Sequence, residues 1–199
     1  MLTVEACVES VERRLAGGDF RCPGECGQVL ARWGYARRRV LRDFGEAVMV
    51  RPRRARCRGC GVTHVLLPVI ALLRRADLAE VIGAALAARA AGAGFRTVAA
   101  GLGRAGPTVR GWLRRFGGRA EAAGVFFTVL LAQTSPDPVM PAGTRDPVAA
   151  AVSAIAGAAA AVASRWPHLG AVPVWEAASA ASGGLLLAPG WPPAGASAN

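Results

Sequence analysis

Four cysteines form two close pairs in the first third of the 199-residue chain. Cys22 and Cys26 are separated by three residues, Cys57 and Cys60 by two, and a glycine follows the second cysteine of each pair. Both spacings are typical of zinc-binding turns, in which each pair aims two sulfurs at one metal ion. Four thiolates fill a tetrahedral coordination sphere and leave no position for water. The pattern therefore predicts one structural Zn²⁺ per chain and no catalytic metal.

Three other interpretations compete with a four-cysteine site, and in the first of them the four cysteines are unrelated thiols. A redox pair at Cys57 and Cys60 would need a strand-to-helix junction, but no helix signal follows Cys60. His64 could replace one cysteine as a ligand, although its position beside Val62 and Val65 is more typical of a strand residue.

The first residues of the chain bear on its compartment. Cys7 follows the amphipathic pattern of a helix predicted over 4–16, which would bury it as a small apolar residue. Glu5, Glu9 and Glu12 come early, so no secretory signal is predicted. We expect a cytoplasmic, reducing compartment, in which closely spaced cysteines are metal ligands rather than disulfides.

A zinc ribbon is predicted over residues 20–68. Short extended segments alternate with turn residues at 28–35, 39–43, 47–52 and 53–56, between the two cysteine pairs. So small a sheet has little core of its own. Metal binding would therefore supply much of its folding free energy, about 10 kcal/mol or more.

Positive charge is concentrated in the first part of the chain. The net charge is +11, and all 24 basic residues are arginine. Of these, 22 precede residue 122, together with 10 of the 13 acidic residues. A basic face attracts polyphosphate backbones. Nucleic acid is therefore the leading class of partner, and an anionic membrane surface is the competing one.

Helical periodicity replaces the strand pattern after residue 72. Asp77 to Glu80 form a possible capping box for a helix that ends at Gly92. A short helix over 95–102 and a third helix with Pro107 in its first turn follow. The third helix has an apolar stripe opposite arginines, which is typical of the second helix of a helix-turn-helix. The stripe consists of Val109, Trp112, Leu113 and Phe116.

Arginines in both segments are candidate DNA contacts, with a solvated basic face as the competing interpretation. Because the arginine face coincides with the side that would enter the major groove, we favour DNA binding. Alternation along the strand would also put several ribbon arginines on one face. The candidates are Thr108 and Arg110 for bases, Arg104, Arg114, Arg115 and Arg119 for phosphates, and Arg53, Arg54 and Arg56 on the ribbon.

Three sequence segments carry a resemblance to known proteins. They are Cys-Pro-Gly followed by Cys-Gly at 22–27, Arg-Pro-Arg-Arg-Ala-Arg-Cys-Arg-Gly-Cys-Gly-Val-Thr-His at 51–64, and Thr-Val-Arg-Gly-Trp-Leu-Arg-Arg at 108–115. Over about residues 20–119 the chain resembles an uncharacterised family of short bacterial zinc-ribbon and helix-turn-helix proteins. It is also similar to the DNA-binding N-terminal region of insertion-sequence transposases. The resemblance implies a non-catalytic DNA-binding regulator or accessory factor of a mobile element. The alternative is the DNA-binding part of a transposase whose catalytic domain is separate or lost.

The C-terminal third is predicted to be helical, with a proline-rich linker inside 121–187 and a disordered tail over 188–199. An apolar helix over 148–163 is short for a membrane span, so a packing or dimerisation helix is favoured and no membrane is predicted. The acids that follow the helix-turn-helix, Asp137, Asp146 and Glu176, do not form a nuclease constellation, so no enzyme is predicted.

Together these patterns predict an α+β chain. A small N-terminal β zinc ribbon, after a helix within 1–19, would precede an all-α helix-turn-helix bundle over 72–120 and the C-terminal helices. The expected partners are double-stranded DNA and either a second copy of the chain or a recombinase. The expected location is the cytoplasm, in association with the nucleoid.

Overall fold

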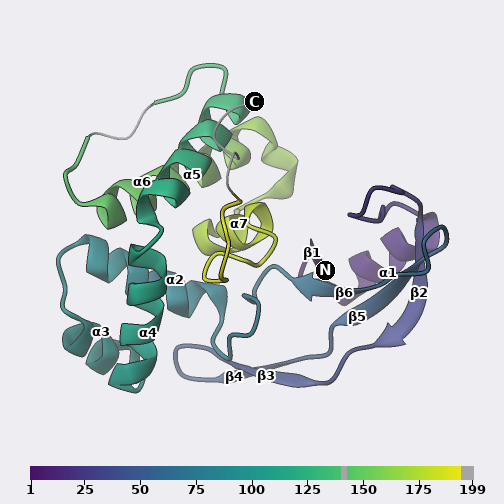
Figure 1. Cartoon of the computed structure of the whole chain (residues 1–199), viewed down its shortest axis with the longest axis horizontal. Helices are drawn as coiled ribbons and strands as arrows, with labels where there is room; N and C mark the ends of the chain where they lie inside the picture. The colour runs from purple at the N-terminus through teal and green to yellow at the C-terminus, as the bar shows by residue number, and fades with distance from the viewer. Residues whose placement is uncertain (140–142, 194–199) are drawn as a thin grey trace.

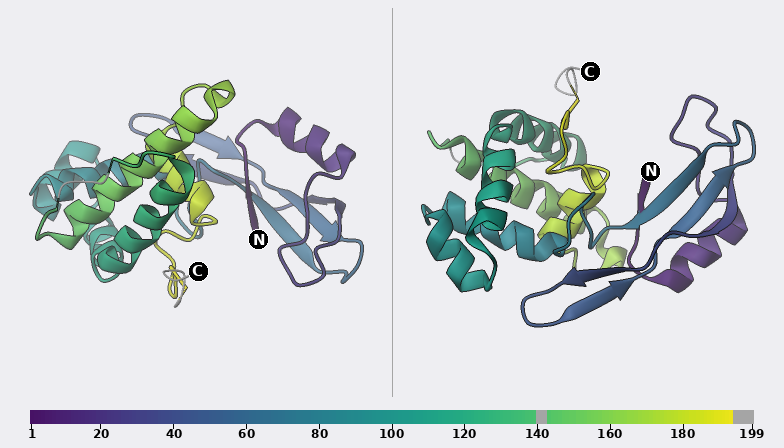
Figure 2. Two further views of the ribbon diagram at one scale, coloured as in Figure 1. Left: turned by 90° about the horizontal axis from the view of Figure 1, so that it is seen from above. Right: turned by 60° about the horizontal axis from the view of Figure 1, so that its bottom comes forward.

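Buried apolar residues separate into two clusters, which divide the chain into an N-terminal strand module and a helical module (Figures 1 and 2). The computed structural model describes residues 1–139 and 143–193. Its mixed composition of strands and helices confirms the predicted α+β class.

The strand module is a four-stranded sheet with one helix against it. The strands are β1 (Leu2–Val4), β2 (Leu30–Tyr35), β5 (Arg53–Cys57) and β6 (Thr63–Pro68), in the order β1-β6-β5-β2, and β1 runs parallel to β6. Helix α1 (Val8–Gly17) buries Val11 and Leu15 in the same cluster as Leu30, Ala55 and Leu66. This cluster is small, as expected for a metal-supported sheet.

A hairpin of β3 (Arg39–Arg42) and β4 (Ala47–Val50) forms a second sheet between the two modules (Figure 1). Its outer face is exposed at Val40 and Met49, which pair across the strands. Leu41 points the other way, is fully buried and belongs to the cluster of the helical module. The hairpin is therefore anchored to the helices although its sequence lies inside the ribbon.

The helical module has one continuous core. Its buried residues come from every α-helix of the module and include Ile82, Trp112, Phe127, Ile155 and Trp175. The helices are α2 (Ala79–Ala90), α3 (Phe95–Leu102), α4 (Gly106–Gly117), α5 (Ala120–Thr134), α6 (Pro147–Arg165) and α7 (Val174–Ala181), with a 3-10 turn η1 (Pro167–Leu169). The expected boundary at residue 121 therefore does not separate two cores.

Local sequence explains several helix ends. Gly103 ends α3 with φ of 60°, a left-handed conformation that glycine adopts without strain. The Asp146 side chain accepts a hydrogen bond from the Val148 N–H at 2.8 Å and caps α6. Gly83 in α2 is required by packing, because a Cβ there would meet the Trp175 ring at 2.0 Å.

Most of the predicted elements are present, but several details of the prediction are wrong. Strand β1 ends at Val4, where the predicted helix was expected to begin, α1 begins only at Val8, and Cys7 is exposed rather than buried. The predicted tail is ordered up to residue 193, with Trp191 only 5% exposed against Phe126. Residues 194–199 lie outside the described residues.

Helix α6, with 19 residues, is long and apolar enough to cross a membrane. It nevertheless lies in the helical core, where Ala151, Ala154, Ile155 and Ala158 are almost completely buried. Its apolar composition is therefore explained by packing, in agreement with the prediction of a packing helix.

Asp77 joins the hairpin to the helices and does not cap α2. Its side chain is 2% exposed and accepts hydrogen bonds from Arg42 of β3 at 3.0 and 2.6 Å and from Arg104 at 2.6 Å. The Arg104 guanidinium also donates to the carbonyls of Leu102 and Asp43. The predicted capping box is therefore wrong, because the Asp77 carboxylate is engaged and α2 has no side-chain cap.

We predict that Asp77→Asn lowers the free energy of unfolding by about 3 kcal/mol, because it leaves the Arg104 guanidinium buried without its counter-charge. Chemical denaturation followed by tryptophan fluorescence measures the change. The control is Asp137→Asn, at an exposed position, which should change stability by less than about 0.5 kcal/mol. Equal effects of the two substitutions would contradict the role given to Asp77.

Candidate functional site

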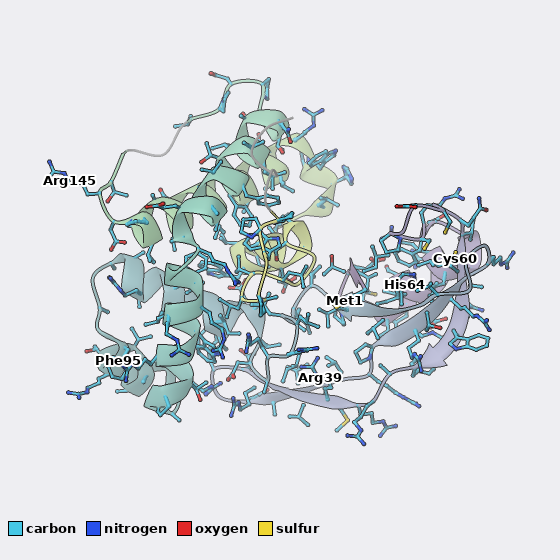
Figure 3. All side chains as sticks on the ribbon, in the orientation of Figure 1. Met1, Arg39, Cys60, His64, Phe95 and Arg145 are labelled. Atoms are coloured by element: carbon cyan, nitrogen blue, oxygen red, sulfur yellow. The ribbon has the colours of Figure 1, made fainter. Side chains whose placement is uncertain are left out.

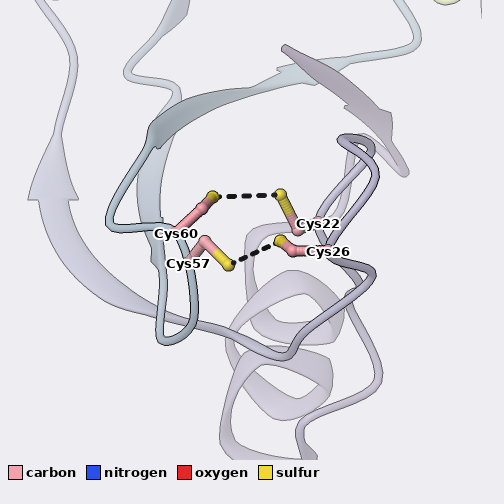
Figure 4. A group of neighbouring side chains, drawn as sticks. All are labelled: Cys22, Cys26, Cys57 and Cys60. Carbon is pink, nitrogen blue, oxygen red and sulfur yellow. Dashed lines mark hydrogen bonds between the residues drawn. The ribbon is translucent and has the colours of Figure 1, made fainter.

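The four predicted cysteine ligands lie together at the end of the strand module (Figure 4). Their sulfur atoms are all within 4.8 Å of one another, with Cys22 and Cys60 3.9 Å apart and Cys26 and Cys57 3.4 Å apart. Sulfurs bound tetrahedrally to zinc at about 2.3 Å would be about 3.8 Å apart. A disulfide would instead need about 2.05 Å. The arrangement fits one tetrahedral metal ion held by Cys22, Cys26, Cys57 and Cys60.

Two similar turns, one for each cysteine pair, position these sulfur atoms. Gly27 and Gly61 follow the second cysteine of each pair with φ of 54° and 73°, a left-handed conformation that glycine adopts without strain. The Gly59 N–H donates to Cys57 Sγ at 3.3 Å. Backbone bonds from Cys22 N to Gln28 O and from Cys57 N to Val62 O close the two turns. Both turns therefore hold their sulfurs by local backbone geometry.

The pKa values of Cys26 and Cys22 are shifted in opposite directions. The Gln28 N–H and hydrogen bonds with the other three thiols lower the pKa of Cys26 to about 6. The Gly24 N–H lowers the pKa of Cys22, but burial and the other sulfurs outweigh it and raise that pKa to about 12. Four negative charges this close repel one another unless a cation lies between them. A divalent ion such as Zn²⁺ supplies that charge, and Cys₄ is one of its usual structural ligand sets.

His64 contacts this group without being one of its four members. It lies on β6, is 7% exposed, and its Nε2 is 3.4 Å from Cys22 Sγ. Burial lowers the pKa of the ring, which favours the neutral imidazole. A neutral His64 with its proton on Nε2 can donate to the Cys22 thiolate. The structure thus places His64 as the predicted strand residue, in a position to support a ligand.

The arginines of α4 lie on its exposed side. Val109, Trp112 and Phe116 are at most 3% exposed, whereas Arg110, Arg114 and Arg115 are exposed. None of these three arginines forms an ion pair with a carboxylate within 1–139 and 143–193. Thr108 is half-buried in the first turn of the helix. The predicted division of α4 into a buried and a basic side is therefore present.

Two predicted DNA-binding arginines have structural roles instead. Arg104 is 11% exposed and bound to Asp77, and Arg53 is 12% exposed and paired with Glu12 of α1. Arg53 lies on the sheet face that α1 covers. It precedes Ala55 and Cys57 by two and four residues, and every second residue of a strand points to the same face. Their guanidiniums are already used for internal contacts, so we correct the assignment of both residues.

The other predicted DNA-binding arginines differ in whether their side chains are already engaged within the protein. Arg119 donates to the Ala188 carbonyl and so fixes the C-terminal segment. Arg54 and Arg56 lie on the open face of the sheet, where Arg56 stacks on Trp33 with its guanidinium carbon 4.6 Å from the ring centroid. Only part of the predicted basic strand is therefore available to a partner.

Arg96 was missed by the sequence analysis. This exposed α3 residue and Arg110 of α4 both lie over the Phe95 ring, with guanidinium carbons 5.7 and 5.8 Å from its centroid. The only feature of the sequence that could have indicated Arg96 as a candidate is its position beside an aromatic residue at the start of a helix. The two arginines extend the basic side of α4 onto α3.

The cysteine group and the α3–α4 segment lie at opposite ends of the molecule, as the positions of Cys60 and Phe95 in Figure 3 show. The β3–β4 hairpin spans the region between them, and its Asp43 carbonyl accepts a hydrogen bond from Arg104 of the α3–α4 turn. The hairpin, rather than the cysteine turns, is the part of the ribbon beside the predicted helix-turn-helix.

Comparisons with protein-family models, with curated proteins and with solved structures find no match to this chain. No family is assigned.

We predict that Cys57→Ser lowers the zinc content from about one ion per chain to nearly none, because a serine hydroxyl does not replace a thiolate ligand. Elemental analysis after dialysis measures the content. Cys7→Ser is the matched control, since Cys7 lies outside the group, and it should keep the full content. A wild-type protein that folds completely without any metal would refute the site.

We predict that His64→Phe weakens zinc binding about tenfold without abolishing it, as expected when a ligand loses its hydrogen-bond donor. Competition with a chromogenic chelator gives the affinity. The exposed His168, the other histidine of the chain, provides the control His168→Phe, which should leave the affinity unchanged. Loss as complete as that of Cys22→Ser would show that His64 is itself a ligand.

Proposed function

We propose that the chain is a non-catalytic protein that binds double-stranded DNA, with α4 as the recognition helix and a structural zinc ion in the strand module. The observation that supports this most strongly is the division of α4. A buried stripe fixes the helix in the core, while Arg110, Arg114 and Arg115 face solvent without acidic partners among the described residues. A helix that enters the major groove needs this combination.

The turn before α4 supports the same proposal. Residues 103–105 connect α3 to α4, and α2, α3 and α4 contribute Ile82, Val98 and Val109 to one core. A helix-turn-helix requires a short connection between its two helices and a core that they share. Arg104 holds this turn to Asp77 and the hairpin, so its role is to position α4.

The roles of the remaining residues follow from their place on α4. Thr108 and Arg110 lie toward its N-terminus, the end that reads base edges in such motifs. Arg114 and Arg115 lie in its last turn, and we assign them to phosphates. Arg96 of α3 and Arg54 and Arg56 of the open sheet face are further candidates for phosphate contact.

Zinc has a structural role in this proposal. Four thiolates leave no open coordination position for a substrate or water. Cys22, Cys26, Cys57 and Cys60 would hold the ion, and the turns would keep the sheet and its hairpin folded. A regulator or accessory factor of a mobile element, located in the cytoplasm with the nucleoid, is the biological role that the sequence resemblance favours.

We predict that Arg110→Ala and Arg114→Ala weaken DNA binding in different ways. Selection from random duplex DNA first gives the preferred sequence, and binding is then measured against several salt concentrations. Loss of Arg110 should reduce preference for that sequence by about 1–3 kcal/mol. Loss of Arg114 should weaken all sequences equally and reduce the salt slope by about one.

Arg145→Ala is the control for this pair, because it removes an exposed arginine from the segment before α6. Its affinity and salt slope should equal those of the wild type. Identical effects of Arg110→Ala and Arg114→Ala would contradict the division of roles. Absence of any salt-dependent binding to duplex DNA would refute the proposed function.

A further inference from the structure

An apolar pocket of about 490 Å³ lies between α5, α6 and the segment 169–181, which includes α7. Its walls include Phe127 and Leu130 of α5 and Ile155 of α6. Val69, which follows β6, closes one side from the strand module. The volume lies in the range of about 300–1,000 Å³ that small-molecule sites occupy.

Small side chains create this space. Ala158 and Ala159 of α6 and Ala177, Ala178 and Ala181 of α7 all line it. Larger residues at these positions would fill the gap between the helices, as leucine and phenylalanine fill the core elsewhere. The pocket is thus a feature of the alanine-rich sequence of the two helices.

The charged groups of the pocket are of one sign. Glu5 and Glu176 line it, and no arginine does, in a chain whose net charge is +11. Glu5 is already paired with Arg14 at 2.8 Å. Glu176 forms no ion pair with any residue that the structure describes. Glu176 is therefore the one carboxylate without an ion-pair partner among the described residues that line this largely apolar space.

The environment of Glu176 disfavours the ionised form of its carboxyl group. Burial is the larger cause and the nearby Glu80 the smaller, and together they raise the pKa of Glu176. Glu80 itself accepts a hydrogen bond from the Trp175 N–H at 3.2 Å, so it is held in place. A positive group beside Glu176 would offset this unfavourable charge, and the apolar walls would accept an attached hydrocarbon.

We propose that this pocket binds a lipophilic cation, an organic ammonium compound with roughly ten apolar carbons, whose charged head pairs with Glu176. The hydrocarbon would lie against Phe127, Leu130 and Ile155. Because the occupant would contact α7 and Val69 together, it would bridge the helical module and the strand module. The inference is independent of the zinc site and of DNA binding.

Calorimetric titration of the zinc-loaded full-length protein tests the proposal without DNA. The probes are n-decylammonium, n-decanol and n-decanoate, so that chain length is constant and only the head group changes. The two ionic probes are used below their micellar concentrations and decanol below its solubility limit. We expect saturable one-to-one binding of decylammonium, at least tenfold tighter than decanol, and no binding of decanoate.

Glu176→Gln separates charge pairing from apolar burial. It should weaken decylammonium about tenfold and leave decanol unchanged, because one charge-assisted bond is lost. Glu121→Gln, at an exposed site on α5 outside the pocket, makes the same charge change and should have no effect. Ala177→Phe should fill the pocket and abolish binding of both probes.

Three outcomes would overturn the inference. They are the absence of saturable decylammonium binding to the folded protein, decanoate binding as tightly as decylammonium, and equal affinities of the wild type and Glu176→Gln for the cation. Because no DNA is present, none of them bears on the proposed function. Loss of DNA binding in Arg114→Ala, in turn, would leave the affinity for decylammonium unchanged.

Discussion

The closeness of four ionisable thiols is the constraint on which, we propose, the N-terminal module depends, because all four can be thiolates only beside a cation. Two unit charges about 4 Å apart interact by about 4 kcal/mol at the effective dielectric constant of a protein surface. The sulfurs lie within 4.8 Å of one another, so their full ionisation requires a cation. The same sulfurs join the turns that precede β2 and follow β5. A metal ion would thus convert an unfavourable cluster of charges into the link that closes the sheet.

Stability in this chain comes from two sources of different kind. The strand module has a small cluster that includes Val11, Leu30 and Leu66, and we propose that a metal ion in the cysteine group adds to its stability. The helical module has a much larger core, which contains none of the four cysteines. Asp77 and Leu41 attach the hairpin to that core, so a ribbon segment belongs physically to the helices. This attachment places the hairpin beside the turn that leads into α4.

Local patterns were predictable, and long-range pairings were not. Cysteine spacing, glycine turns and the apolar stripe of α4 depend on residues close in sequence, so the ligands and most elements could be predicted. Arg53 and Arg104 were misassigned because their partners, Glu12 and Asp77, lie 41 and 27 residues away. The sequence around an arginine does not distinguish a side chain that forms an internal ion pair from one that faces solvent. The apolar pocket could not be predicted either, since a cavity depends on how three helices and a loop meet.

Hydrogen–deuterium exchange with and without zinc tests most directly the claim that metal supports the strand module alone. After removal of the ion by a chelator, amides of β2, β5 and β6 should lose most of their protection. Those of α2, α4, α5 and α6 should keep theirs, because their core contains no metal ligand. Unchanged protection of the sheet, or simultaneous loss of protection in both modules, would contradict this account.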